Sequence, residues 1–379
     1  MKPALSLPAR SPLPLCLPRL VFGEGCISRL GEELRLSGAH RPMLVTDRGL
    51  ERAGVIRTVE EALPSWAATF LEVPENPTAA GADAALAVFR AGKCDAIVAV
   101  GGGSVLDTAK LVCALVHLDI PAADLIGKPD RIHSAVPLIA VPTTVGTGSE
   151  SSPVAALHIT ADGVGIGTRS PLLVPKVALC DPALVRSLPP RLIAATAIDA
   201  LSHCIEGYFA EPEHPVIDAL ALDGAARVMA SVEEALLTEG DAARASLMAA
   251  AFAGGAAIHK GLGPAHAVAL ACGDQDIHHG TLVGVALPGT TALLASRLPA
   301  KAARLAAAMG LETADEIADR LSALMERLGL PMTLDDAGYV IRDRDKLVQD
   351  LVDSPFNRTS PYVPSREEYQ AMLASLTDA

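Results

Sequence analysis

The chain has 379 residues, of which 50% are hydrophobic and 20% charged, so it can bury a large core and is not a disordered protein. Its formal net charge of −13 argues against nucleic acid or an anionic membrane as the main partner. The seven cysteines are scattered and form no CxxC pair, which indicates a reducing compartment, and we identify no signal peptide or membrane span. We therefore expect a cytoplasmic protein whose partners are small molecules.

The first half of the chain alternates apolar runs with helical stretches. The runs cover residues 43–46, 96–100 and 138–141, and helical patterns over 82–91 and 104–117 lie between them. None of the runs alternates in polarity, as expected for strands of a parallel sheet that is covered on both faces. The strand–helix–strand order predicts a doubly wound α/β domain with right-handed crossovers.

The second half of the chain has a different pattern of hydrophobic residues, which from about Pro189 onward is almost wholly helical. One predicted helix has Thr313 and Glu316 spaced as a capping box at its start and Gly329 at its end. The stretch 187–190, with two prolines, is the expected boundary. The sequence therefore predicts an α/β domain over 1–187 and an all-helical domain over 188–379.

Three glycines, Gly101, Gly102 and Gly103, stand between the second apolar run and the helix that follows it. Glycine lets a backbone approach a pyrophosphate closely, and a helix N-terminus offers free N–H groups and a positive dipole end. Ser104 can cap this helix or donate to a phosphate. Asp107, one turn in, can accept a hydrogen bond from a ribose or an amide, or simply favour the helix dipole. The position at the end of a strand favours a nucleotide site over a purely structural turn.

The other two strand ends support a nucleotide site. Asp47 ends the first run, where an acidic residue can bind the ribose 2′-hydroxyl and repel a 2′-phosphate, so NAD is favoured over NADP. The segment 142–150, Pro-Thr-Thr-Val-Gly-Thr-Gly-Ser-Glu, follows the third run and is rich in hydroxyl groups. Alone, each feature also fits a turn or a polar loop; together they predict one wall of a cofactor site.

A carboxylate and an imidazole stand four residues apart in a strongly apolar stretch, at Asp199 and His203. On a helix they share one face and can bind one cation together, although such a pair can also form a simple hydrogen bond. Further imidazoles follow at His266, His278 and His279. One aspartate with three histidines suits Fe(II) or Zn(II) better than Mg(II).

Together these segments resemble the iron-containing (group III) alcohol dehydrogenase family. They occur in the family's order, cover nearly the whole chain and are jointly specific, although none is specific alone. The matching stretches are 21–25, 45–47, 75–78, 101–104 with Asp107 and Lys110, 142–150, 181–182, 199–206, 261–266 and 279–280.

The resemblance implies a Rossmann-like, dinucleotide-binding N-terminal domain and an all-α C-terminal domain, the fold shared with dehydroquinate synthase, with cofactor and metal in the cleft between them. It also implies a homodimer. The implied metal ligands are Asp199, His203, His266 and His279. The implied cofactor contacts are Asp47 at the adenosine ribose, Gly101, Gly102, Gly103 and Ser104 at the pyrophosphate, and Thr143, Thr144 and Thr147 along the cofactor.

The chain departs from the family pattern at two positions. Family members usually carry a second histidine four residues after the ligand at 266, where this chain has Leu270, and often a lysine that touches the cofactor, where it has Gly165. His278 can replace the missing imidazole as the proton-handling group, or can itself be the ligand in a loop that looks one residue shorter. The glycine after His279 matches the family's His-Gly and favours His279 as the ligand.

The resulting hypothesis is hydride transfer between NAD and a small alcohol or aldehyde, aliphatic or anionic, assisted by Fe(2+), with Zn(2+) as the alternative ion. One alternative is a metal-independent reductase like maleylacetate reductase, against which the full ligand set argues. Another is a lyase of the dehydroquinate synthase type, whose metal site normally includes glutamate. The last is a protein that binds NAD without turnover.

Overall fold

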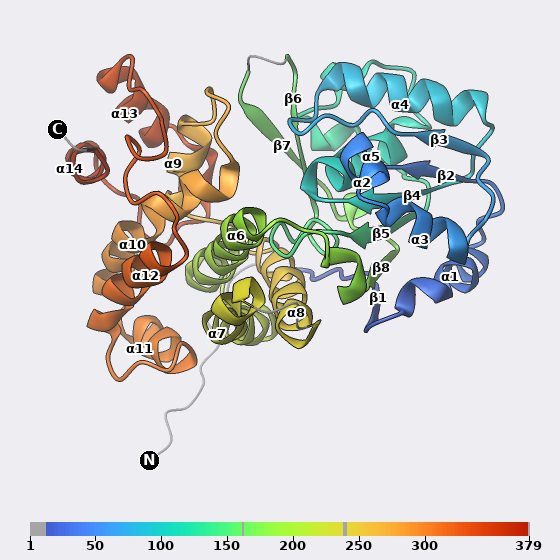
Figure 1. The fold of residues 1–379 in the computed structure, drawn as a ribbon. Helices are drawn as coiled ribbons and strands as arrows, with labels where there is room; N and C mark the ends of the chain where they lie inside the picture. Colours follow the sequence, from blue (N-terminus) through green and yellow to red (C-terminus); the bar gives the residue numbers. More distant parts are fainter. Residues whose placement is uncertain (1–12, 161–162, 238–240, 378–379) are drawn as a thin grey trace.

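The computed structural model describes residues 13–160, 163–237 and 241–377 and consists of an α/β part followed by a helical part (Figure 1). No helix within these ranges is both long and apolar enough to cross a membrane. The described strands are β1 (Arg19–Phe22), β2 (Pro42–Val45), β3 (Ala68–Phe70), β4 (Ala96–Gly101), β5 (Leu138–Pro142), β6 (Val154–His158), β7 (Gly165–Arg169) and β8 (Val177–Cys180).

Six of these strands form one sheet in the order β1-β8-β5-β4-β2-β3, and every pair in it is parallel. The remaining two, β6 and β7, form a separate antiparallel hairpin. The strand order reverses between β2 and β4, since the chain proceeds outward from β2 to β3 and then restarts at β4 on the other side. In open parallel sheets, ligands bind at the carboxyl ends of the strands at such a reversal.

Helices cover both faces of the sheet, which explains the apolar runs without alternation. In β4, Ile97 and Ala99 join the core under α4 (Ala79–Ala91) and α5 (Gly103–Leu115). The alternate residues of β4 join the opposite core, formed with α1 (Leu30–Leu36) and α3 (Val55–Ala62). A short α2 (Arg48–Arg52) follows β2. The doubly wound arrangement predicted from the sequence is confirmed.

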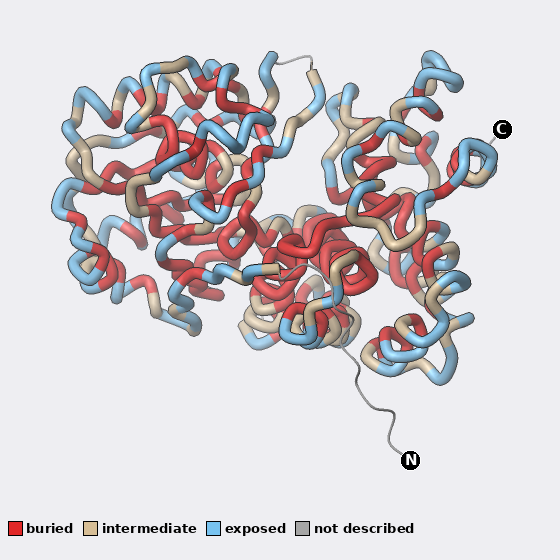
Figure 2. Tube along the Cα trace, turned by 180° about the vertical axis from the view of Figure 1, so that it is seen from behind, coloured by how far each residue is buried: buried red, intermediate tan, exposed pale blue. Residues whose placement is uncertain are grey.

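The second part of the chain is built around α6 (Pro190–Phe209). This helix contacts α7, α8 and α10, and all its residues from Ile193 to Phe209 are buried (Figure 2). The other helices are α7 (Pro215–Leu237), α8 (Asp241–Ala257), α9 (Pro264–Ala271), α10 (His279–Arg297), α11 (Pro299–Ala308), α12 (Ile317–Arg327), α13 (Arg344–Val352) and α14 (Arg366–Ser375). The described 3-10 helices are η1 (Cys26–Arg29), η2 (Ala122–Asp124), η3 (Pro129–Arg131), η4 (Pro171–Leu173), η5 (Pro182–Val185), η6 (Ala314–Glu316) and η7 (Pro355–Arg358).

Several local expectations can be compared with these elements. The capping box of Thr313 and Glu316 is present and starts η6, which leads into α12. Ser104 does not cap α5, because the helix begins at Gly103 and the N-cap position belongs to Gly102. The strands end with β8 and the long helices begin with α6, so the expected boundary between 187 and 188 falls in the connection between them. The domain division at that residue remains our proposal.

Candidate metal centre and cofactor site

Four side chains from three helices meet around one carboxylate oxygen. Asp199 and His203 lie one turn apart on α6, His266 lies in α9, and His279 is the first residue of α10. The Oδ1 atom of Asp199 is 3.7 Å from Nε2 of His203 and 3.9 Å from Nε2 of both His266 and His279. Three of these residues, Asp199, His266 and His279, place their candidate ligand atoms within 4.8 Å of one another. The arrangement is that of a cation site with one carboxylate and three imidazole donors.

The polar atoms at the centre of this cluster have no hydrogen-bond partner of their own. Oδ1 of Asp199 and Nε2 of His266 are both buried, and neither finds a partner among the described residues. Buried polar groups normally have a hydrogen-bond partner, so two unpartnered atoms that face each other are consistent with a cation bound between them. Burial lowers the pKa of His203 to about 3, which keeps its imidazole neutral. A metal requires neutral imidazoles, so the residues present fit a divalent ion.

Glu206, two turns after Asp199 on α6, orients the ring of His266. Its Oε2 atom is 2.6 Å from Nδ1 of His266, and its carboxylate also accepts the backbone N–H groups of Ala265 and His266. A proton on Nδ1, donated to the carboxylate, leaves Nε2 with a free lone pair on the side of Asp199. This role of Glu206 was not predicted, although its spacing of seven residues from Asp199 puts both on one helix face.

The two adjacent histidines differ in position. His279 belongs to the cluster, and its side chain is 53% exposed, which leaves the group open on that side. His278 is the N-cap residue of α10 and lies outside the group, with its buried Nδ1 atom unpartnered among the described residues. The residue after His279 is Gly280, and a side chain would not fit there, because a Cβ would come within 2.4 Å of the Ala195 carbonyl oxygen. The geometry therefore brings His279, rather than His278, to Asp199.

The two departures from the family pattern can also be located. Leu270 is a half-buried residue of α9, and no described histidine has taken its place on that helix. The apolar ring of Phe356, from η7, packs against His266 with ring centroids 5.7 Å apart. Gly165 is the first residue of β7, and a Cβ there would lie 3.4 Å from Nε2 of His158. An imidazole thus occupies the space beside the glycine.

The expected cofactor residues gather at the carboxyl ends of β2, β4 and β5, at the reversal of the strand order. A Cβ on Gly102 would meet the methyl group of Thr144 at 2.9 Å, and one on Gly103 would meet that of Thr147 at the same distance. The glycine turn and the threonine segment are therefore in contact, and only glycine permits that approach. Gly101 is restricted similarly, because a Cβ there would overlap Val105 at 2.5 Å. Thr143, the residue directly after β5, is buried.

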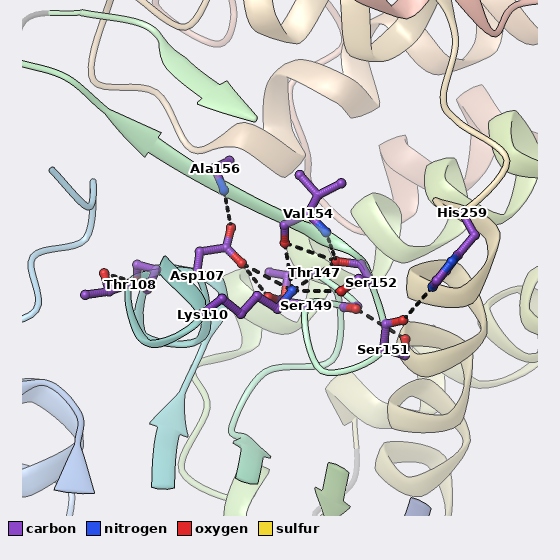
Figure 3. A network of polar contacts seen from close by, with 12 residues as sticks. Asp107, Thr108, Lys110, Thr147, Ser149, Ser151, Ser152, Val154, Ala156 and His259 are labelled. Atoms are coloured by element: carbon purple, nitrogen blue, oxygen red, sulfur yellow. Dashed lines mark hydrogen bonds and ion pairs between the residues drawn. The ribbon is translucent and has the colours of Figure 1, made fainter. Parts of the chain in front are cut away.

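Three further expected residues have protein partners already. Asp47 caps α2, with Oδ1 accepting the backbone N–H of Leu50 at 2.9 Å. Ser104 is the second residue of α5, and its carbonyl accepts the hydroxyl of Thr108. Asp107 accepts the Ser149 hydroxyl on one oxygen and the Ala156 N–H, at 2.9 Å, on the other. The carboxylate of Asp107 is thus part of an internal network (Figure 3).

Two segments on opposite sides of the site make direct contact. The amide of Asn76, before α4, donates to Oδ1 of Asp276 at 3.1 Å, and Asp276 lies two residues before His278. The same loop is held to the helical part by Gln275, which exchanges two hydrogen bonds with the backbone of Val340. The α/β part therefore touches the loop that leads into the cluster of Asp199, His266 and His279.

Comparison with known proteins identifies relatives of the whole chain. A family model described as iron-containing alcohol dehydrogenase matches residues 18–182, and its companion for the C-terminal region matches residues 193–377. The chain is 38% identical over 365 residues to 4-hydroxybutyrate dehydrogenase from Cupriavidus necator, covering 92% of this chain and 95% of that protein. A solved structure of 1,3-propanediol oxidoreductase superposes with a TM-score of 0.91 at 28% identity, over 97% of this chain and 100% of the other. Sulfoacetaldehyde reductase from Bifidobacterium kashiwanohense, solved in complex with NAD+, superposes with a TM-score of 0.87 at 25% identity and the same coverage.

Proposed function

Because this chain belongs to the iron-containing alcohol dehydrogenase family, we propose that it oxidises a short aliphatic hydroxy acid to the semialdehyde and transfers the hydride to NAD. It is an oxidoreductase that acts on small alcohols and aldehydes. One observation carries the proposal, namely the convergence of three imidazole nitrogens on one buried carboxylate oxygen.

For the metal ion we propose the ligands Asp199, His203, His266 and His279, with Fe(2+) as the ion and Zn(2+) as the second choice. One carboxylate and three imidazoles suit both ions. A divalent cation bound there supplies Lewis-acid stabilisation of the alkoxide form of the substrate. The chain's own contribution is to orient the imidazoles, and the buried carboxylate of Glu206 does this for His266.

His278 is our proposed acceptor for the proton that the substrate hydroxyl group loses on oxidation. It directly precedes His279, and its buried Nδ1 atom has no hydrogen-bond partner within the described ranges. An imidazole nitrogen with a free lone pair can accept that proton, and the same group returns it in the reduction.

For the dinucleotide we propose a site at the carboxyl ends of β2, β4 and β5. The pairing of the glycine turn with the threonine segment supports it, as does the NAD+ complex of the sulfoacetaldehyde reductase. The acidic side chain after β2 favours NAD over NADP, because it repels a 2′-phosphate. The proposed contacts are Asp47, Gly101, Gly102, Gly103, Ser104, Asp107, Thr143, Thr144 and Thr147.

The hydroxy-acid substrate class is supported by the 4-hydroxybutyrate dehydrogenase of Cupriavidus necator. A substrate carboxylate needs a basic partner near the metal. Phe356 packs on His266, and Arg358 is exposed two residues further along the same short helix. Asn357 anchors this helix through its amide, which donates to the carbonyls of Leu351 and Val352. We assign Arg358 as the group that attracts the carboxylate.

We further infer a homodimer located in the cytoplasm. The strand β1 is an edge of the large sheet, and Leu20 and Phe22 are 43% and 42% exposed on it. An exposed apolar edge strand can pair with a second copy of itself. All seven cysteines are free thiols, which supports a reducing compartment.

The metal-dependent part of the proposal is tested by elemental analysis of protein purified without oxygen. We expect about one iron or zinc per chain, lost in His266→Ala together with NAD reduction. His117→Ala, an exposed histidine after α5, is the matched control and should retain both. A wild-type protein without metal, even after addition of Fe(2+), would refute the metal-dependent mechanism and favour a metal-independent reductase.

The substrate class is tested by comparing kcat/KM for 4-hydroxybutyrate and for 1-butanol. Loss of a charge-assisted hydrogen bond in Arg358→Met should lower the value for the acid by about 10-fold or more and leave that for butanol nearly unchanged. Arg57→Met, an exposed arginine on α3, should change neither. Equal losses on both substrates would show that Arg358 does not recognise the carboxylate.

A further inference from the structure

The loop between β5 and β6, residues 143–153, touches both halves of the proposed site. It begins with the threonines that contact the glycine turn and ends at the polar network around Lys110 (Figure 3). Along the way it packs against α6 and α8, in the helical part of the molecule. We call this segment the β5–β6 loop.

On the side of α5, the loop is held by a buried lysine. The ammonium group of Lys110 donates to the Ser152 carbonyl and hydroxyl, both at 3.1 Å, and to the Val154 carbonyl at 2.7 Å. Its side chain is fully buried, so all three donors act within the protein. The hydroxyl of Ser149 is held by Asp107, which lies one helical turn before Lys110. Removing the ammonium would leave these acceptors without their donor, at a substantial free-energy cost.

On the side of the metal cluster, the same loop packs backbone to backbone against α8. A Cβ on Gly255 would lie 2.0 Å from the Gly148 carbonyl oxygen, so the two segments touch without intervening side chains. The hydroxyl of Ser151 donates to the Phe252 carbonyl at 2.7 Å, and Nε2 of His259 lies 3.1 Å from the Ser151 carbonyl. The loop therefore makes direct contact with the C-terminal half of α8.

From α8 and from the loop itself the contacts continue to the proposed metal ligands. Gly254, next to the contact with the loop, approaches His203 so closely that a Cβ would lie 3.0 Å from the Cβ of that histidine. Gly146 of the loop faces the Thr196 carbonyl on α6, where a Cβ would overlap it at 2.2 Å. Thr196 lies one turn before Asp199. A close-packed interior has little free volume to absorb a displacement, so a shift of the loop would be transmitted to α8 and α6.

We propose that the β5–β6 loop couples the dinucleotide site to the metal site, so that each ligand tightens the binding of the other, with Lys110 as the positioning residue. This inference rests on the proposed function. A dinucleotide at the glycine turn would contact the threonine end of the packed loop and restrict its residual motion, so less conformational freedom is left to lose when the metal binds. Thermodynamic linkage requires the effect to be equal in both directions.

A purely structural role of Lys110 makes a different prediction. In that case its removal weakens metal binding, dinucleotide binding or the fold, but the ratio of metal affinities with and without dinucleotide is unchanged. Only a positioning role that spans the two sites alters this ratio. The coupling ratio is therefore the quantity to measure, and it does not depend on catalytic activity.

The experiment uses full-length protein freed of metal by a chelator, with Zn(2+) alone as the metal probe. Its Kd is measured by competition with a chromophoric chelator, in the absence and presence of saturating NAD+. We expect wild type to bind Zn(2+) about 10-fold more tightly with NAD+, and Lys110→Met to reduce this ratio to near one. Thr108→Val is the matched control, because this buried hydroxyl on the same helix bonds only within the helix, and it should keep the wild-type ratio.

Ser149→Ala provides a second variant in case Lys110→Met fails to fold, since it removes only the bond to Asp107. It should also lower the ratio. A ratio of one in wild type, or an unchanged ratio in the folded variants, overturns the coupling. Wild-type protein that binds Zn(2+) but no NAD+ would instead refute the proposed function, so the two failures are distinguishable.

Discussion

The tautomer of His266 depends on a single neighbouring carboxylate, that of Glu206. Because Glu206 binds Nδ1 and two backbone N–H groups, it fixes both the ring and the start of α9. Such partners of metal-binding histidines typically contribute about 10- to 100-fold to metal affinity. We expect Glu206→Gln to raise the Zn(2+) Kd by roughly that factor, measured by chelator competition.

The control for this variant is Glu60→Gln, at an exposed position on α3. It should leave the Kd unchanged. If Glu206→Gln bound Zn(2+) as tightly as wild type, the carboxylate would have no part in orienting the ligand.

A second carboxyl group, that of Glu150, is expected to make stability depend on pH. It is 1% exposed, and burial raises its pKa to about 7, against the opposing effect of Lys110. The folded state therefore keeps a proton that the unfolded chain releases at lower pH, so stability is present in acid and lost as the pH rises. Between pH 5 and pH 7.5 we expect a loss of roughly 2 kcal/mol from this group.

Glu150→Gln should flatten this dependence, because the amide cannot ionise. The measurement is the midpoint of urea unfolding at several pH values, with Glu60→Gln as the control that keeps the wild-type slope. Identical pH profiles for wild type and Glu150→Gln would mean that the carboxyl group is ionised in the folded protein at neutral pH.

Among the secondary-structure elements, α6 and α10 pack closely together, because α10 starts directly against α6. A Cβ on Gly280 would lie 2.4 Å from the Ala195 carbonyl oxygen and 3.2 Å from the Cβ of Asp199. Overpacking of this kind costs about 1–3 kcal/mol. We expect Gly280→Ala to lower the unfolding free energy by that amount and to weaken Zn(2+) binding, since the two helices must separate.

Gly289→Ala is the matched control on the same helix. A Cβ at Gly289 meets nothing within 4 Å, and alanine is the better helix former, so this variant should be neutral or slightly stabilising. If both alanine variants behaved alike in urea unfolding and in Zn(2+) affinity, the close approach of α10 to α6 would not matter for the metal site.

For the whole molecule, the exposed edge at β1 is the feature that bears on assembly. We expect wild-type protein to be a dimer by size-exclusion chromatography with light scattering. The double variant Leu20→Lys and Phe22→Lys should be monomeric, because lysines on an edge strand oppose pairing between copies. Leu36→Lys, at an exposed leucine that ends α1, should leave the dimer intact. A dimeric double variant would place the interface elsewhere. A monomeric wild type would exclude the dimer.

Much of the fold is predictable because its signals are local. A strand buried on both faces must be apolar throughout, so the runs that became β2, β4 and β5 are visible in the sequence. The edge strand β1 was not predicted, since it is short and only one residue in it is partly covered by the core. The ends of an element are harder to predict than its presence: the helix expected over 104–117 is α5, which runs from Gly103 to Leu115.

What the sequence by itself determined is the set of candidate groups and their local geometry. Asp199 and His203 share a helix face because four residues make one turn, and the glycine turn follows a strand because the apolar run ends there. Only the tertiary structure decided that His279, and not its neighbour, meets Asp199, that Glu206 holds His266, and that Lys110 holds the β5–β6 loop. These contacts join residues that are 42 to 80 positions apart in the sequence. Which of these residues meet depends on how the helices and the sheet pack, and no local sequence pattern encodes that packing.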